Sequence, residues 1–201
     1  MNDTRKNIQK SIIEVLFFRG FFPEIFKSYF NLKASYLSQL AKCQSEARLL
    51  AYGFTISILL FFERLPGKVV SYPSEGLQRP LLPSIGIDLF ASIFFVPLFL
   101  YLVSAILHLA LLPFSGKASF FQSRLAFFWS IIVCAPFLLI FSLVEAFSPD
   151  IFPFNFIKYI TVALSAWIFS SIVCAAEGFS SHLPLFFGIL VSYLFLLSLI
   201  T

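Results

Sequence analysis

The chain has 201 residues, of which 59% are hydrophobic and only 12% are charged. Soluble domains are close to half apolar and a quarter charged, so this composition excludes an ordinary water-soluble domain. A helix needs about 20 apolar residues to cross the hydrocarbon layer of a membrane, which leaves room for about five spans and for no separate catalytic domain. The net charge of +4 resides mainly in the first 48 residues, which indicates membrane orientation and not nucleic-acid binding.

Residues 1–45 precede the first expected span and predict a segment at the membrane surface. Their early part has helical spacing, with Ile8, Ile12, Val15 and Leu16 on one face and Lys6, Lys10 and Glu14 on the other. We therefore predict an amphipathic interfacial helix that ends at Gly20 and Pro23. Glu14 and Arg19 interrupt the apolar run, so a cleaved signal peptide is not expected.

Five apolar stretches follow and predict membrane spans over residues 47–62, 85–114, 124–147, 156–176 and 183–200. Residues 63–83 are rich in proline and glycine and predict a polar loop. The second stretch is long for one crossing, and we expect a bend at Pro97; Pro136 lies inside the third. The predicted fold is an all-α polytopic bundle, with five transmembrane helices over residues 46–201 and an interfacial segment over residues 1–45.

Lysine and arginine determine the expected orientation, because they remain on the cytoplasmic side of short loops. With five spans, ten of the fourteen lie on the side of the N-terminal segment and four on the other. We therefore expect a cytoplasmic N-terminus and an outside C-terminus, in a bacterial inner membrane. The lipid bilayer is one partner; other membrane proteins, or further copies of this chain, are the others.

Cys43, Cys134 and Cys174 lack the paired spacing of a metal site or a redox motif, and we expect free thiols. The chain contains none of the short motifs typical of metalloproteases, serine hydrolases or phosphate-binding loops. We therefore expect no catalytic residues, no metal and no cofactor.

One set of ionisable residues is a candidate polar cluster. His108 lies among Leu and Ala near the end of the second span, and Arg124 and Glu177 are expected on the same cytoplasmic side. The interpretation favoured here is structural: His108, Arg124 and Glu177 meet and fix how the second, third and fourth helices pack. Two alternatives remain open, namely a His108 that bonds only to a neighbouring carbonyl or hydroxyl, and a proton-relay or ligand role.

Residues 88–136 resemble bacterial members of the Ypt-interacting protein (Yip/Yif) family. The resemblance is based on Ser104–Leu109 (SAILHL), Gly116–Ser119 (GKAS), Ser123–Trp129 (SRLAFFW) and Pro136, with weaker similarity at Glu46–Ala51 and Ala176–Phe179. It implies five transmembrane helices and a cytoplasmic N-terminus. Eukaryotic relatives are associated with small GTPases and vesicle traffic, but the Asp-Leu-Tyr-Gly-Pro-like stretch of those proteins is absent here.

Together these features predict a non-catalytic membrane scaffold or interaction protein of the Yip type. The alternative is a small transporter or channel subunit that uses proline-bent second and third helices, since broken helices can line substrate sites. Transport would require a water-accessible polar path at mid-membrane. A scaffold predicts a dry bundle with polar groups at its ends.

Overall fold

The computed structural model describes residues 23–42, 45–71, 81–147 and 154–200, and all regular structure within these ranges is helical. A helical segment over residues 23–30 comes first. It is followed by α2 (Leu32–Ala41), α3 (Glu46–Ser71), α4 (Leu81–Leu111), the 3₁₀ helix η1 (Leu112–Phe114), α5 (Phe120–Phe147), α6 (Phe154–Glu177) and α7 (Leu183–Ile200). The all-α prediction is thus confirmed for the described residues, whereas the predicted interfacial helix around residues 8–16 lies outside them.

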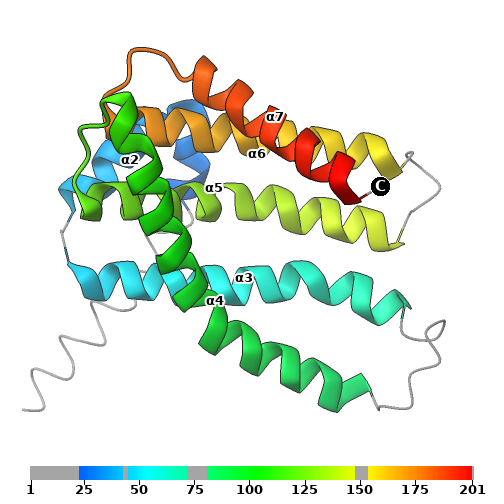
Figure 1. Cartoon of the computed structure of the whole chain (residues 1–201). Coiled ribbons are helices and arrows are strands. Elements are labelled where there is room, and N and C mark those ends of the chain that lie inside the picture. Colours follow the sequence, from blue (N-terminus) through cyan, green and yellow to red (C-terminus); the bar gives the residue numbers. More distant parts are fainter. Residues whose placement is uncertain (1–22, 43–44, 72–80, 148–153, 201) are drawn as a thin grey trace, which may run out of the picture.

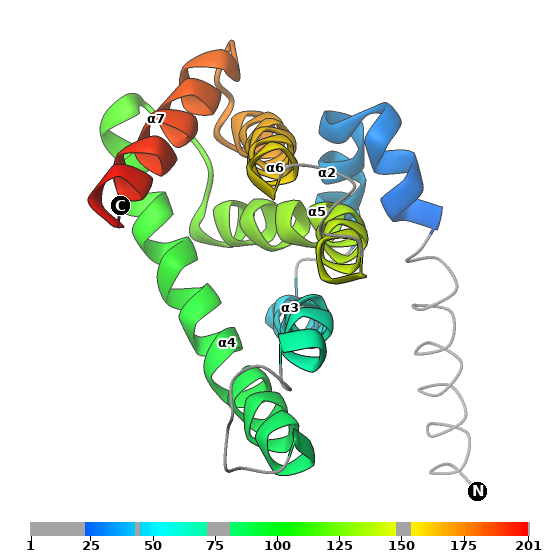
Figure 2. The same cartoon turned by 90° about the vertical axis from the view of Figure 1, so that its right-hand side faces the viewer.

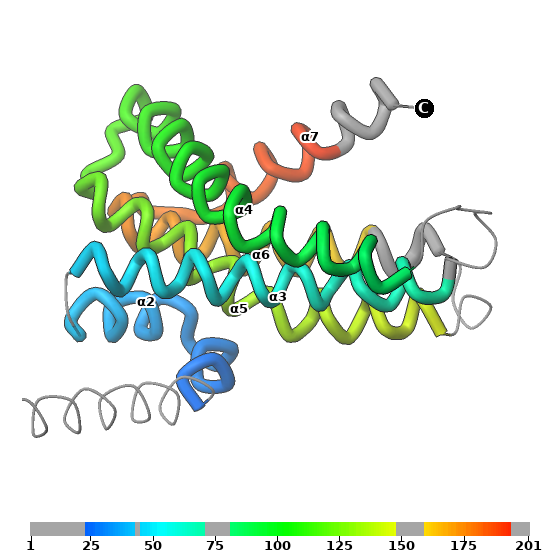
Figure 3. Tube along the Cα trace, turned by 90° about the horizontal axis from the view of Figure 1, so that it is seen from below, coloured from blue at the N-terminus to red at the C-terminus, as the bar shows by residue number. Residues whose placement is uncertain are grey.

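The helices α3, α5 and α6 run side by side and form the centre of the bundle (Figure 1). In addition, α4 packs on α3 and α5, and α7 packs on α6. Figure 2 shows α4 and α7 slanting away from this centre on one side, with the helices of residues 23–41 on the other. Seen from below, α2 covers only one end of the bundle (Figure 3).

Four helices in the described part of the chain are long and apolar enough to cross a membrane: Glu46–Val70, Leu81–Phe114, Phe120–Phe147 and Tyr159–Glu177. Their length and composition fit an integral membrane protein. A shorter apolar stretch, Leu183–Tyr193, belongs to α7.

Several helix ends differ from those expected from the sequence, because prolines did not stop the helices. The first predicted span continues through Pro66 to Ser71, although residues 63–83 were expected to form a loop. At the start of α4, Pro83 lies in the first turn. N–H groups of the first turn have no acceptor within the helix, so a proline there costs no hydrogen bond. The helix α6 likewise begins two residues before the predicted Phe156.

The side chain of Ser119 sets the start of α5 at Phe120, four residues before the predicted start. The Ser119 hydroxyl accepts a hydrogen bond from the Gln122 N–H (3.3 Å), and the Gln122 side chain accepts one from the Ser119 N–H (2.8 Å). This reciprocal pair is a capping box, which supplies partners for helix-terminal N–H groups. The first helical residue is therefore Phe120, so Arg124 is about one turn inside the helix.

The core is centred on α5, whose residues Phe128, Trp129 and Ile132 are fully buried. They pack with Ile56 of α3 and Ile172 of α6. By contrast, most of the outer side chains of α4 are exposed in the isolated chain. The helix α4 changes direction about half-way along its length (Figure 1). Pro97, the residue at which the bend was predicted, lies inside this helix, and proline is a common cause of helix kinks.

Candidate functional site

The polar groups of the bundle gather at one end, which we call the capped end. It consists of residues 23–42, the start of α3, the end of α4, the start of α5 and the end of α6 (Figures 1 and 3). The opposite end consists of the end of α3, the start of α4, the end of α5 and the start of α6 (Figure 1).

A tight connection between α4 and α5 positions the first group of polar residues. Ser115 adopts the left-handed conformation (φ 66°), and the chain then passes Gly116 and contacts the end of α6. The Lys117 N–H donates to the backbone carbonyl of Glu177 (3.2 Å), and the Ala118 N–H donates to the Glu177 carboxylate (3.1 Å). Glu177 therefore holds the α4–α5 connection against α6.

Gly116 permits this close approach. A Cβ atom at this position would be 2.5 Å from the Glu177 carboxylate oxygen Oε2 and 3.1 Å from the Leu111 carbonyl. Real Cβ contacts are almost never as short as the first distance, so any larger residue would displace the carboxylate.

His108 of α4 lies beside the same carboxylate. Its Nδ1 is 3.9 Å from Oε1 of Glu177, the two residues are 4% and 1% exposed, and the Phe120 ring packs on the imidazole at 4.1 Å. This distance is longer than a hydrogen bond. Both atoms, together with the Ser123 hydroxyl, are buried and have no hydrogen-bond partner among the described residues. Buried polar groups without partners are unfavourable, which makes this a candidate functional cluster.

The third predicted member of the cluster, Arg124, has another partner. Its guanidinium forms two hydrogen bonds with the carboxylate of Glu46 (3.1 and 2.6 Å) and lies over the Tyr101 ring at 5.6 Å. The structure therefore brings His108 and Glu177 together, but it places Arg124 in a separate ion pair that connects α5 with the start of α3. Of the three residues that were expected to meet, Arg124 thus pairs with Glu46 and not with Glu177.

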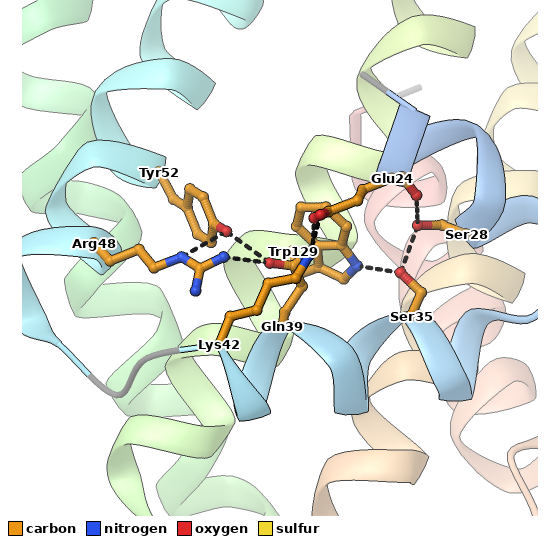
Figure 4. Close-up of polar contacts among 8 residues, drawn as sticks. All are labelled: Glu24, Ser28, Ser35, Gln39, Lys42, Arg48, Tyr52 and Trp129. Atoms are coloured by element: carbon orange, nitrogen blue, oxygen red, sulfur yellow. Dashed lines mark hydrogen bonds and ion pairs between the residues drawn. The ribbon is translucent and has the colours of Figure 1, made fainter. Parts of the chain in front are cut away.

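Residues 23–42 are held on the capped end by a hydrogen-bond network that the sequence had not singled out (Figure 4). Gln39 is its centre: the side-chain amide donates to Glu24, and its oxygen accepts from Arg48 (2.6 Å) and from the Tyr52 hydroxyl (2.9 Å). Glu24 also pairs with Lys42. Because Arg48 and Tyr52 belong to α3, this network fastens α2 to the first span.

Three further bonds fasten the same segment to α5. The Trp129 indole donates to the Ser35 hydroxyl (2.9 Å), Tyr29 donates to the Val133 carbonyl (2.8 Å), and Tyr36 donates to the Gln122 carbonyl (3.3 Å).

Both phenols of this segment remain hydrogen-bond donors at neutral pH. Burial raises the pKa of Tyr29 to about 12, with a smaller effect from nearby Cys134. The pKa of Tyr36 is also raised to about 12, chiefly by burial and secondly by the negative charge of Glu177.

The opposite end has a simpler arrangement. Lys68 of α3 pairs with Asp88 of α4 and also donates to the Ser84 carbonyl (3.3 Å). The Ser142 hydroxyl donates to the Glu63 carbonyl, which connects α5 with α3. A cavity of about 340 Å³ lies between α3 and α4 and is lined in part by Arg64.

Several buried hydroxyls within the spans bond to their own helices. Ser57, Ser104, Ser130 and Ser170 each donate to a carbonyl three or four residues earlier in the same helix. Such hydroxyls require no water. Cys134 and Cys174 are buried free thiols, whereas Cys43 lies outside the described residues. Where the chain is described, no group of three or more His, Cys, Asp or Glu side chains could hold a metal ion.

Comparisons of the chain with models of protein families, with curated proteins and with solved structures gave no match. Its function must therefore be inferred from the geometry.

Proposed function

We propose that this protein is a non-catalytic scaffold or interaction protein of an inner membrane, of the Yip type, with α7 as a fifth span. In this proposal the capped end faces the cytoplasm, as the excess of lysine and arginine on that side predicts. The C-terminus then lies outside.

The observation that carries the proposal is the arrangement of residues 23–42. Their inner side is bonded to α3 and α5, whereas Lys27, Leu37 and Ser38 are exposed at the surface. A segment held rigidly, with an exposed outer face, loses little conformational entropy when a partner binds. Residues 23–42 could therefore serve as a binding surface for a partner protein, which we call the docking platform.

The bonding of the buried serines favours a scaffold over the alternative, a small transporter or channel subunit. A transport path requires polar groups that water can reach at mid-membrane. Four of the buried serines, namely Ser57, Ser104, Ser130 and Ser170, donate to their own helices instead. The cavity between α3 and α4 extends from Lys68 and Asp88 at the opposite end as far as Phe61 and Val96, and the cavity beside α2 is lined by residues 24–39, outside the spans.

Photo-crosslinking in intact membranes tests the docking role. A photoreactive residue at Leu37 of α2 should capture a specific protein, because this side chain is 46% exposed. The matched control replaces Phe94 of α4, which is 56% exposed but lies in an apolar span and should contact lipid. Capture of the same protein from both positions, or from neither, would contradict a docking platform on α2.

Thiol labelling separates the alternative function and tests the orientation. In a background without native cysteines, Ser130→Cys should resist a small water-soluble thiol reagent, whereas rapid labelling would favour a transport path. A cysteine introduced at Lys117 should react with a membrane-impermeant reagent only after the cells are opened. Labelling of this position from outside intact cells would refute the proposed orientation.

A further inference from the structure

A second pocket at the capped end is separate from the His108–Glu177 pair. It lies between α2 and the end of α6, and its volume is about 300 Å³. Its polar lining consists of Lys33 from α2, Ser171 and Cys174 from α6, and Ser180 and His182 from the connection to α7. None of its lining residues is acidic.

Apart from the Cys174 thiol, which donates to the Phe179 carbonyl (3.2 Å), the polar side chains that line this pocket have no hydrogen bond or ion pair with another described residue. The Lys33 ammonium is in none of the ion pairs within the described ranges. His182 Nε2 is buried and has no hydrogen-bond partner there, and its ring packs edge-on against Trp167. The Ser171 and Ser180 hydroxyls form no hydrogen bond with another described residue.

The electrostatic surroundings of the pocket favour a negative charge. The 18-residue helix α7 begins at Leu183, directly after His182, and the N-terminus of a helix is its positive end. The end of α6 would oppose this effect, but the Cys174 carbonyl accepts from two backbone N–H groups and the Glu177 carbonyl accepts from Lys117.

We propose that this pocket binds a phosphate group, supplied by the headgroup of an anionic membrane lipid or by a soluble phosphate. The Lys33 ammonium and the hydroxyls of Ser171 and Ser180 can donate to the oxygens of one phosphate, and the bond from the ammonium is charge-assisted and therefore strong. The pocket lies at the end of the span formed by α6, where headgroups border the hydrocarbon layer. This inference does not depend on the proposed scaffold role.

Binding to the purified full-length protein in a neutral detergent tests the proposal. Native mass spectrometry with phosphatidylglycerol should show a saturable bound lipid, and phosphatidylcholine should bind more weakly because its headgroup carries a compensating cation. Lys33→Gln should reduce the affinity about tenfold, the effect of losing one charge-assisted hydrogen bond. Lys27→Gln is the matched control, because Lys27 is also exposed but lines a different pocket.

Inorganic phosphate distinguishes the two sources. If millimolar phosphate displaces the lipid, or binds alone and loses affinity in Lys33→Gln, the pocket recognises the phosphate group itself. An unchanged lipid affinity in Lys33→Gln would overturn the proposal, and so would equal losses in both lysine variants, since these indicate general surface charge. Ser171→Ala provides a second variant: a reduced affinity supports the pocket, and unaltered binding in both Ser171→Ala and Lys33→Gln rules it out.

Discussion

The capped end contains a fully buried carboxylate, whereas the ion pair between α3 and α4 at the opposite end is partly exposed. At the capped end, Glu177 is 1% exposed and accepts a backbone hydrogen bond while it lies beside His108. At the opposite end, the side chains of the pair Lys68 and Asp88 are 29% and 49% exposed. Removing one partner from a buried, hydrogen-bonded carboxylate leaves an unpaired polar group in the interior and lowers the stability of the fold. An exposed ion pair contributes little to stability, so its removal costs little. The capped end should therefore determine helix packing far more than the opposite end does.

The largest expected difference concerns the two carboxylates. Glu177→Ala leaves the Ala118 N–H without its acceptor, and it should lower the free energy of unfolding by about 1–3 kcal/mol. Asp88→Ala removes only an exposed ion pair and should cost less than about 1 kcal/mol. Reversible unfolding of the detergent-solubilised protein measures both values. Equal losses in the two variants would show that burial does not distinguish the ends.

Alanine substitutions at two glycines, one at each end of the bundle, test how closely the backbone is packed there. Gly116→Ala should destabilise the protein by about 1–3 kcal/mol, because the added methyl group overlaps the Glu177 carboxylate. Gly86→Ala in α4 is the control: nothing lies within 4 Å of its Cβ position, so alanine should be neutral or stabilise the helix by up to about 1 kcal/mol. The same unfolding measurement applies, and a neutral Gly116→Ala would refute the close approach.

The existence and order of the helices α3 to α7 followed from hydropathy, because their apolar stretches are long and their periodicity is not needed to recognise them. The helices over residues 23–41 were not predicted. The ends of α3 to α7 were harder to predict, since prolines such as Pro66 and Pro83 can lie within helices near their termini. The capping box at Ser119 and Gln122 was visible in the sequence and could have given the start of α5.

The candidate site was only partly predictable. The expected sidedness of the spans placed His108, Arg124 and Glu177 at similar depth, but it did not specify which helices touch around the bundle. The sequence therefore grouped Arg124 with Glu177, whereas its partner in the structure is Glu46, which lies at the same end of the bundle on α3. The network around Gln39 had no sequence signal, because isolated Ser and Gln residues in a helix occur equally often on solvated surfaces.

The smallest expected effect concerns Tyr36, which joins residues 23–42 to α5 at the capped end. Tyr36→Phe removes one hydrogen bond to the Gln122 carbonyl and should cost about 1 kcal/mol at neutral pH. Tyr159→Phe is the matched control, since Tyr159 is 49% exposed on α6.

The pH dependence tests the origin of this effect. The pKa of Tyr36 is raised by burial to about 12 in the folded protein, compared with 10.0 for an ordinary tyrosine. The folded state therefore holds this proton more tightly than the unfolded state, and the resulting stability is present in full below pH 10 and is lost as the pH rises toward 12. The stability difference between the parent protein and Tyr36→Phe should shrink over this interval. A difference that stays constant up to pH 12 would mean that the Tyr36 hydroxyl is solvated, and that α2 does not lie on α5 as described.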